Sequence, residues 1–200
     1  MSVKRLKMLC AVVAVTLLAG LPFGGMSLTG PIAQAAACPA GDGGAGYGAA
    51  PGAVSASGVT GTTSADLAAF ASRFNAIRVS ACLSPIPPAN FRFDQCLQDR
   101  LFWVAEDPST SLGSAWGHRP TRSDGAPVVG CDGNLAGGSN YTGATLADKW
   151  WNSPSHQQSL YRPASTANPA SICIGFAMTH GGVPNEPASF VRASALRTTC

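Results

Sequence analysis

Residues 64–78 read SADLAAFASRFNAIR, and this stretch says more about the fold than any other part of the chain. Its large apolar residues recur at intervals of three and four: Leu67, Phe70, Phe74 and Ile77. That spacing places them on one face of an α-helix. Ser64 is a residue type suited to the N-cap of that helix. The stretch therefore predicts an amphipathic helix that packs its apolar face against a core.

The residues that follow predict three more helices and, after them, two strands. In chain order these elements are a helix capped by Asp94, a helix that begins at Thr142 or Thr145, a short helix that begins at Ser153-Pro154, and strands over 171–179 and 188–194. Residues 109–139 are rich in glycine and aperiodic, so we expect them to be mostly loop with short strands at most. Helices followed by strands predict an α+β domain.

The first residues predict an export signal. Lys4, Arg5 and Lys7 precede an apolar run over 8–21, and Ala33-Gln34-Ala35 resembles a cleavage site. The apolar run is shorter than the ~20 residues that a membrane-spanning helix needs. We expect a signal peptide over 1–37, a flexible Gly/Ala/Ser/Pro-rich lead-in over 38–63, a folded domain over 64–200, no transmembrane segment, and a secreted, extracellular protein.

Cysteine usage agrees with export. Loss of Cys10 with the signal leaves an even number of cysteines: Cys38, Cys82, Cys96, Cys131, Cys173 and Cys200. In an exported chain these are expected to form disulfides, whose pairing the sequence alone does not determine. Cys82 follows the first helix and Cys96 begins the second, so we pair these two as a hypothesis. The same hypothesis pairs Cys131 with Cys173 and Cys38 with Cys200.

Charge and motif content exclude several classes of function. The formal net charge of +3 comes from Lys4, Arg5 and Lys7, because cations and acids balance in the rest of the chain. A body with Lys149 as its single lysine has no basic stripe for a phosphate backbone, so we expect no nucleic-acid partner. The Gly-x-Ser-x-Gly elbow of a serine hydrolase is absent around Gly113-Ser114-Ala115.

Short motifs in a particular order carry a family resemblance. In chain order they are Asn75-Ala76-Ile77-Arg78, Asp94-Gln95-Cys96-Leu97, His118, Asp132-Gly133-Asn134-Leu135-Ala136-Gly137-Gly138, Trp150, Ser153-Pro154-Ser155-His156, Leu160 and Ile174-Gly175-Phe176. Together they resemble the CAP superfamily (cysteine-rich secretory proteins, antigen 5 and pathogenesis-related proteins), also called the SCP domain. The resemblance is greatest to its bacterial secreted members.

That resemblance implies a three-layer α-β-α sandwich, here stabilised by disulfides, with a central cleft. On this sequence the cleft residues are His118, His156, Asn134 and Asp132. The resemblance also implies that His118 and His156 bind a divalent cation such as zinc. Asn134 is interpreted as a structural amide that bridges two backbone segments, in preference to a ligand contact.

One position departs from the family pattern. The family has glutamate in Gly-Glu-Asn-Leu-Ala, and this chain has Gly133 there. A zinc site of three or four ligands then needs another group, and the candidates are Asp132, Asp124, Glu106 and His180. The alternative interpretation is that both histidines are structural, with His118 packed beside Trp116.

Two functions of different classes follow. The first is extracellular binding of an unknown ligand, a lipid, a protein or a cell-wall component, with no catalytic residue assigned. The alternative is a metal-dependent extracellular hydrolase that uses His118 and His156. A third possibility is a structural envelope protein whose cleft is filled by its own side chains.

Overall fold

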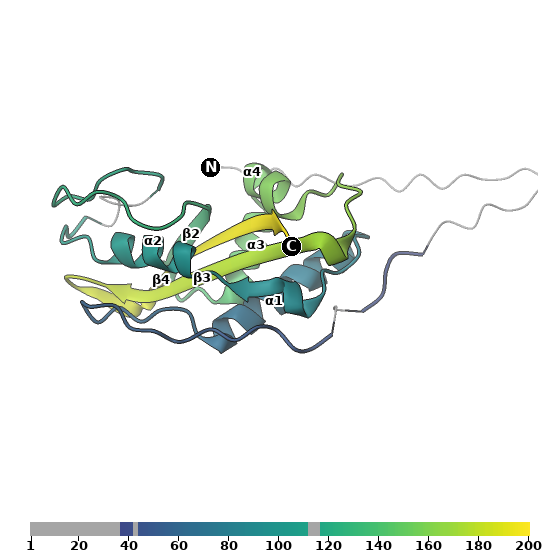
Figure 1. Cartoon of the computed structure of the whole chain (residues 1–200), viewed down its shortest axis with the longest axis horizontal. Helices are drawn as coiled ribbons and strands as arrows, with labels where there is room; N and C mark the ends of the chain where they lie inside the picture. Colours follow the sequence, from purple (N-terminus) through teal and green to yellow (C-terminus); the bar gives the residue numbers. More distant parts are fainter. Residues whose placement is uncertain (1–36, 42–43, 112–116) are drawn as a thin grey trace, which may run out of the picture. The chain divides into compact units, whose positions relative to one another are not determined.

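The computed structural model describes residues 37–41, 44–111 and 117–200, and they form an α+β unit around a mixed sheet of strand order β1-β3-β4-β2 (Figure 1). The longer elements are α1 (Ser64–Ser80), β1 (Phe91–Phe93), α2 (Gln95–Ala105), β2 (Asn134–Ser139), α3 (Gly143–Trp151), α4 (Pro154–His156), β3 (Ile172–Gly182) and β4 (Glu186–Thr199). Short helical turns are η1 (Pro88–Asn90), the π-helical η2 (Gln157–Tyr161) and η3 (Pro169–Ser171).

Helix α1 forms where the apolar spacing predicts it. Its N-cap is Thr63, one residue before the predicted Ser64, because Thr63 and Asp66 form a reciprocal capping box. The predicted apolar face, which includes Phe70 and Phe74, is fully buried. Burial of each phenylalanine stabilises the fold by about 1.5–3 kcal/mol.

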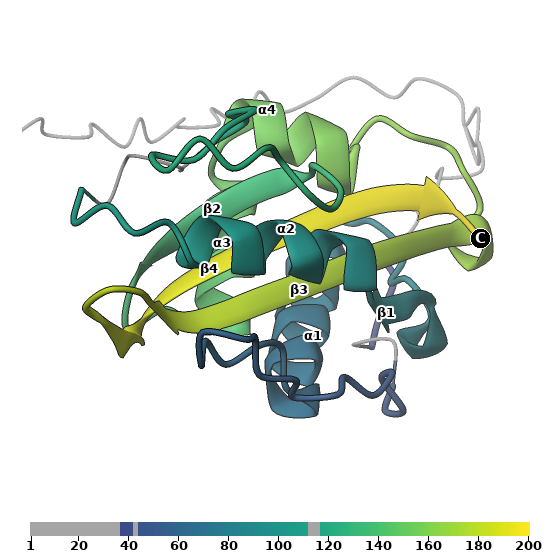
Figure 2. The ribbon, with the colours of Figure 1, turned by 60° about the vertical axis from the view of Figure 1, so that its left-hand side comes forward.

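The two faces of the sheet carry different helices. Side chains of β3 alternate, so that Phe176 and Met178 pack with α1 and α3 while Ala177 packs with Leu97 and Leu101 of α2. Figure 2 shows α2 in front of β3 and β4, with α1 and α3 behind them. The large core therefore lies between α1, α3 and the sheet, and a smaller one lies under α2.

Close backbone approach sets the position of α3 against α1. Gly143 begins α3, and a Cβ atom on it would lie 2.4 Å from the carbonyl oxygen of Asp66 and 2.7 Å from the amide nitrogen of Phe70. Thr142 caps α3 by accepting from the amide of Thr145. Of the two start positions that the sequence allowed, Thr142 is therefore the one used.

Two strands were not predicted. β2 lies inside the stretch expected to be mostly loop, and its glycines and alanines hide the apolar alternation of a strand. It exists because it pairs antiparallel with β4, from Asn134 opposite Ala195 to Ser139 opposite Phe190. β1 is too short to show a period, and it pairs in parallel with β3.

The segment over 38–63, expected to be a flexible lead-in, contacts the folded unit. The amide of Thr62 donates to Oε1 of Gln98 at 2.8 Å, and the amide of Met178 donates to Oγ1 of Thr62 at 2.7 Å. Val59 and Thr62 are buried. Backbone and hydroxyl hydrogen bonds, which composition does not show, account for this packing.

The predicted signal peptide over 1–37 lies outside the described residues except for Ala37, and Trp116 also lies outside them. Within the described part of the chain, no helix is both long and apolar enough to span a membrane.

All three predicted disulfide pairings are wrong. The structure joins Cys38 to Cys82, Cys96 to Cys131 and Cys173 to Cys200, with Cα–Cα distances of 4.7, 5.0 and 5.1 Å. Cys82 follows α1 and Cys96 lies in α2, and these helices pack on opposite faces of the sheet. The sheet therefore separates Cys82 from Cys96, although no other cysteine lies between them in the sequence.

The antiparallel register of β3 and β4 explains one of the observed pairs. Cys173 lies opposite Thr198 in that register, which brings the end of β4 to the start of β3. The amide of Cys200 also donates to the carbonyl of Ser171. The Cys173–Cys200 bond therefore closes the end of a long hairpin.

We expect peptide mapping of the oxidised protein under non-reducing conditions to recover these pairs alone. Replacing Cys96 and Cys131 together with serine should lower the free energy of unfolding by about 2–4 kcal/mol, because it frees a long loop in the unfolded chain. Chemical denaturation measures this loss. A Cys82–Cys96 peptide in the map would contradict the arrangement.

Candidate functional site

The loop between α2 and β2 brings His118 and Asp132 together. Nδ1 of His118 lies 2.5 Å from Oδ2 of Asp132. Both side chains are well exposed, at 66% and 51%. An exposed pair contributes at most about 1 kcal/mol to stability. Its main effect is therefore to orient the imidazole ring.

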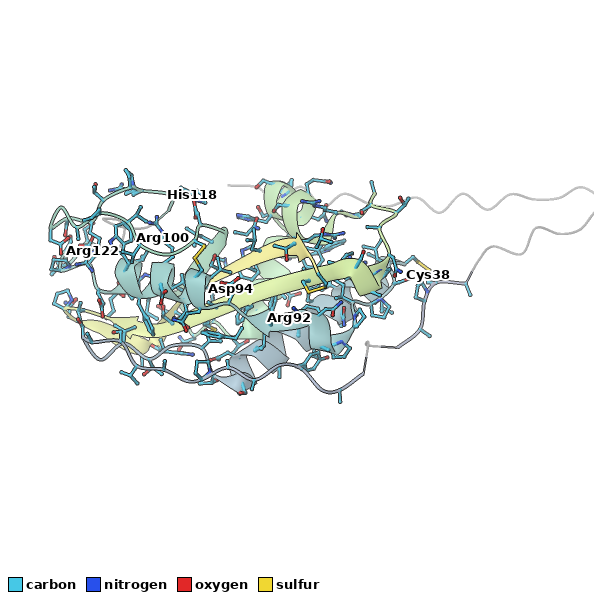
Figure 3. The ribbon with its side chains drawn as sticks, in the orientation of Figure 1. Cys38, Arg92, Asp94, Arg100, His118 and Arg122 are labelled. Atoms are coloured by element: carbon cyan, nitrogen blue, oxygen red, sulfur yellow. A yellow bond between two sulfur atoms is a disulfide. The ribbon has the colours of Figure 1, made fainter. Side chains whose placement is uncertain are left out.

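Helix α2 holds both ends of this pair. Nη2 of Arg100 donates to the carbonyls of Gly117 and Arg119, at 3.0 and 2.8 Å, on either side of His118. Figure 3 shows Arg100 and His118 on the same side of the molecule. The Cys96–Cys131 disulfide attaches the residue before Asp132 to the start of α2. The sequence did not single out Arg100 as a residue that positions the site.

A groove of about 280 Å³ follows the edge strand β2. It is lined by Leu135, Ala136, Gly137, Lys149, Trp150, Ser153 and His156. These residues come from β2, from the end of α3 and from the start of α4, so three of the quoted motifs converge here. Among the predicted cleft residues, His156 alone lines this groove.

His156 interacts electrostatically with His118. Partial burial lowers the pKa of His156, and the charge of His118 lowers it further. The two imidazoles are thus near enough for like-charge repulsion, although they come from segments far apart in the sequence. His156 is favoured in its neutral form, which can donate and accept hydrogen bonds.

Asn134 joins structural elements, as interpreted from the sequence. Its Nδ2 donates to the carbonyl of Ala195 on β4 at 3.0 Å. Its Oδ1 accepts a hydrogen bond from the hydroxyl of Ser159 in η2. The amide therefore links the edge strand to its neighbour and to the segment that follows His156.

Other motif residues are also structural. Asn75 pairs with both the amide and the carbonyl of Ile86, at 2.9 and 2.8 Å. Arg78 donates to the carbonyls of Ser84 and Tyr161. Asp94 caps α2 by accepting from the amide of Leu97. These motifs hold loops against helices and leave the groove to other residues.

Gly133 has no room for the glutamate of the family pattern. A Cβ atom on it would lie 2.5 Å from Oγ of Ser194, 3.1 Å from the carbonyl oxygen of Ala195 and 3.2 Å from Cδ2 of Leu97. The hydroxyl of Ser194 is buried without a hydrogen-bond partner. Here the neighbouring strand occupies the space that a side chain would need.

The residues present do not fit a zinc site of three or more protein ligands. The described residues contain no group of three or more His, Cys, Asp and Glu side chains that could hold a metal ion. The remaining candidate ligands have partners elsewhere: Asp124 pairs with Arg122, Glu106 accepts from the amide of Ser57, and His180 pairs with Asp66. Metal binding by His118 and His156 stays a prediction.

Two groove residues were missed in the sequence. Lys149 lines the groove, and its Nζ lies 4.7 Å from the centre of the Tyr141 ring. Its position as the single lysine of the body was a usable signal. Ser153 is the N-cap of α4, as the Ser153-Pro154 pair predicts, but its side chain makes no cap hydrogen bond and it also lines the groove.

Comparison with known proteins gives no match: no protein-family model, no curated protein and no solved structure is significantly similar to this chain. The family resemblance therefore rests on the motifs of the sequence alone.

We expect Gly133→Ala to lower the free energy of unfolding by about 1–3 kcal/mol, because the new Cβ overlaps the Ser194 hydroxyl. Adding Ser194→Gly should recover part of that loss. Denaturation of both single variants and the double variant gives the coupling. An unchanged stability of the Gly133→Ala variant would show that the strand yields at no cost.

We expect His118→Gln to raise the pKa of His156, because it removes the like charge. An NMR titration of the imidazole resonances measures this shift, and His180→Gln is the control that leaves the pKa of His156 unchanged. The folded pKa of His156 lies below the unfolded value of about 6.5. Its contribution to stability therefore falls as pH drops from about 6.5 through the folded pKa, since the unfolded chain binds the proton first. A pKa of His156 that is equal with and without His118 would contradict this pairing.

Proposed function

We propose that this chain is a secreted CAP/SCP-type protein that acts by binding an extracellular ligand, with no catalytic residue assigned. The groove along β2 carries the proposal. Its walls come from three motifs of the resemblance, namely the Asn134–Gly138 stretch, Trp150 and the Ser153–His156 stretch. Helices on both faces of a mixed sheet support the α-β-α sandwich that the resemblance implies.

Export is supported by the covalent structure. Three disulfides account for every cysteine after Cys10. Disulfides persist in oxidising compartments and are rare in the cytosol. The basic and apolar residues at the start of the chain agree with this assignment.

The chemistry of the groove favours binding over hydrolysis. Leu135 and Ala136 supply apolar lining, and Lys149 and His156 line the same groove. Trp150 also borders the groove, but its side chain is fully buried. The carboxylate of Asp132 is engaged with His118. The groove thus offers apolar contact and hydrogen bonds, and it suits the polar end of a lipid or a small unit of a cell-wall polymer or protein.

An NMR titration of the oxidised, mature protein tests this function with two probes, laurate as a lipid and muramyl dipeptide as a cell-wall fragment. We expect one probe to shift the amides of residues 135–137 and the ring of His156. Lys149→Gln and His156→Gln should each lower the affinity for that probe by about tenfold, because each removes one hydrogen bond to a charged group. Arg162→Gln, which removes a cation outside the groove, should leave it unchanged.

A second experiment, titration with zinc, distinguishes the binding function from the hydrolase alternative. Calorimetric titration with zinc should give no heat that depends on both His118 and His156, because the described residues group no third ligand with them. Binding that is lost in both His118→Ala and His156→Ala would favour the metal-dependent hydrolase. Failure of both organic probes to shift residues 135–137 would count against the groove as the binding site.

A further inference from the structure

Three arginines surround the end of η2, away from the groove. They are Arg78 on α1, Arg162 directly after η2 and Arg197 near the end of β4. Nη1 of Arg78 and Nη1 of Arg197 each donate to the carbonyl of Tyr161 at 3.1 Å. Two guanidinium groups therefore converge on one carbonyl oxygen.

Arg197 and Arg162 use only part of their donors in these contacts. Nη1 of Arg197 also donates to the carbonyl of Leu160 at 3.3 Å, and Nε of Arg162 donates to the carbonyl of Ser159 at 3.3 Å. A guanidinium has five N–H donors. The carbonyls at the end of η2 thus hold the two side chains while leaving other N–H groups available.

No carboxylate side chain pairs with these three arginines among the described residues. Three arginines elsewhere in the described chain pair with carboxylates: Arg73 with Asp148, Arg122 with Asp124 and Arg192 with Glu186. Arg100 resembles the cluster instead, because it donates to backbone carbonyls. Burial, and then the charge of Arg197, lowers the pKa of Arg78 to about 10. Burial, and then the charge of Arg162, lowers the pKa of Arg197. The cluster is therefore a concentration of positive charge without a counter-ion.

A pocket of about 270 Å³ opens onto this cluster. Arg162 and Arg197 line it together with hydroxyl-bearing residues: Ser165, Ser171, Thr198 and Thr199. None of these residues lines the groove along β2. Forked N–H donors beside hydroxyl donors suit a tetrahedral anion, because arginine binds two oxygens of one phosphate or sulfate at once.

We propose that the pocket between Arg162 and Arg197 is a binding site for a phosphate or sulfate group. In this site, Arg162 and Arg197 contact the oxyanion, and Thr199, which lies on the same face of β4 as Arg197, contributes a hydroxyl donor. Arg78 lies behind the pocket and adds positive charge without lining it. The site is separate from the groove and does not depend on its ligand.

Titration of the oxidised protein with inorganic phosphate, inorganic sulfate and glycerol 1-phosphate, at constant ionic strength in chloride, tests the site. We expect saturable shifts in the amides of residues 197–199. Arg162→Gln should weaken binding by about tenfold or more, because it removes a charged donor. Arg162 is exposed and bonds one carbonyl of its own turn, so this variant tests the site without the structural contacts of Arg197.

Two further variants decide the outcome. Arg162→Lys should restore part of the affinity, because it keeps the charge and loses the fork. Lys149→Gln should leave phosphate binding unchanged, so that the groove and the arginine pocket are tested by reciprocal variants. Tighter binding of glycerol 1-phosphate than of both inorganic anions would identify a phosphate ester as the ligand class. Shifts that do not saturate, or that are equal in Arg162→Gln and the unmodified protein, would overturn the proposal.

Discussion

The packing of α1 against the sheet is the interaction on which the rest of this structure depends. The ring of Phe70 stacks on Phe176 of β3 with centroids 4.3 Å apart, and Phe74 stacks on Tyr161 with centroids 4.0 Å apart. The first contact fixes the helix on β3. The second fixes η2, and with it the segments that lead to the groove and to the arginine pocket. One helix face thus sets the distance between both candidate sites and the central strands.

Helix α2, on the opposite face of the sheet, mainly holds the loop that carries His118 and Asp132. Its apolar contacts with the sheet are few, but its Arg100 holds the His118 loop and its Cys96 holds the residue before Asp132. A Gly-rich connection between α2 and β2 would otherwise have high conformational freedom. Hydrogen bonds and a disulfide here replace the apolar packing that orders the other face, and they bring His118 near His156.

Charged residues are few in this chain, and each candidate site has its own cations. Arg73, Arg122 and Arg192 are each matched by a carboxylate, so they contribute to structure. Lys149 at the groove and the arginines around η2 form no ion pair with a carboxylate side chain among the described residues. Cations without a carboxylate partner that lie beside cavities keep N–H donors for an anionic ligand.

Local sequence determined the helices, since a helix and its cap use hydrogen bonds between residues three or four apart. Asp94 caps where the sequence predicted, and Thr142 is one of the two helix starts that the sequence allowed. It also indicated the two long strands and the six cysteines that follow Cys10. Only the tertiary structure decided strand β2, the disulfide pairing, the packing of residues 44–63 and the groove beside His156. Each of these joins residues that are far apart along the chain, and no local pattern records which distant surface a glycine, a cysteine or an arginine will meet.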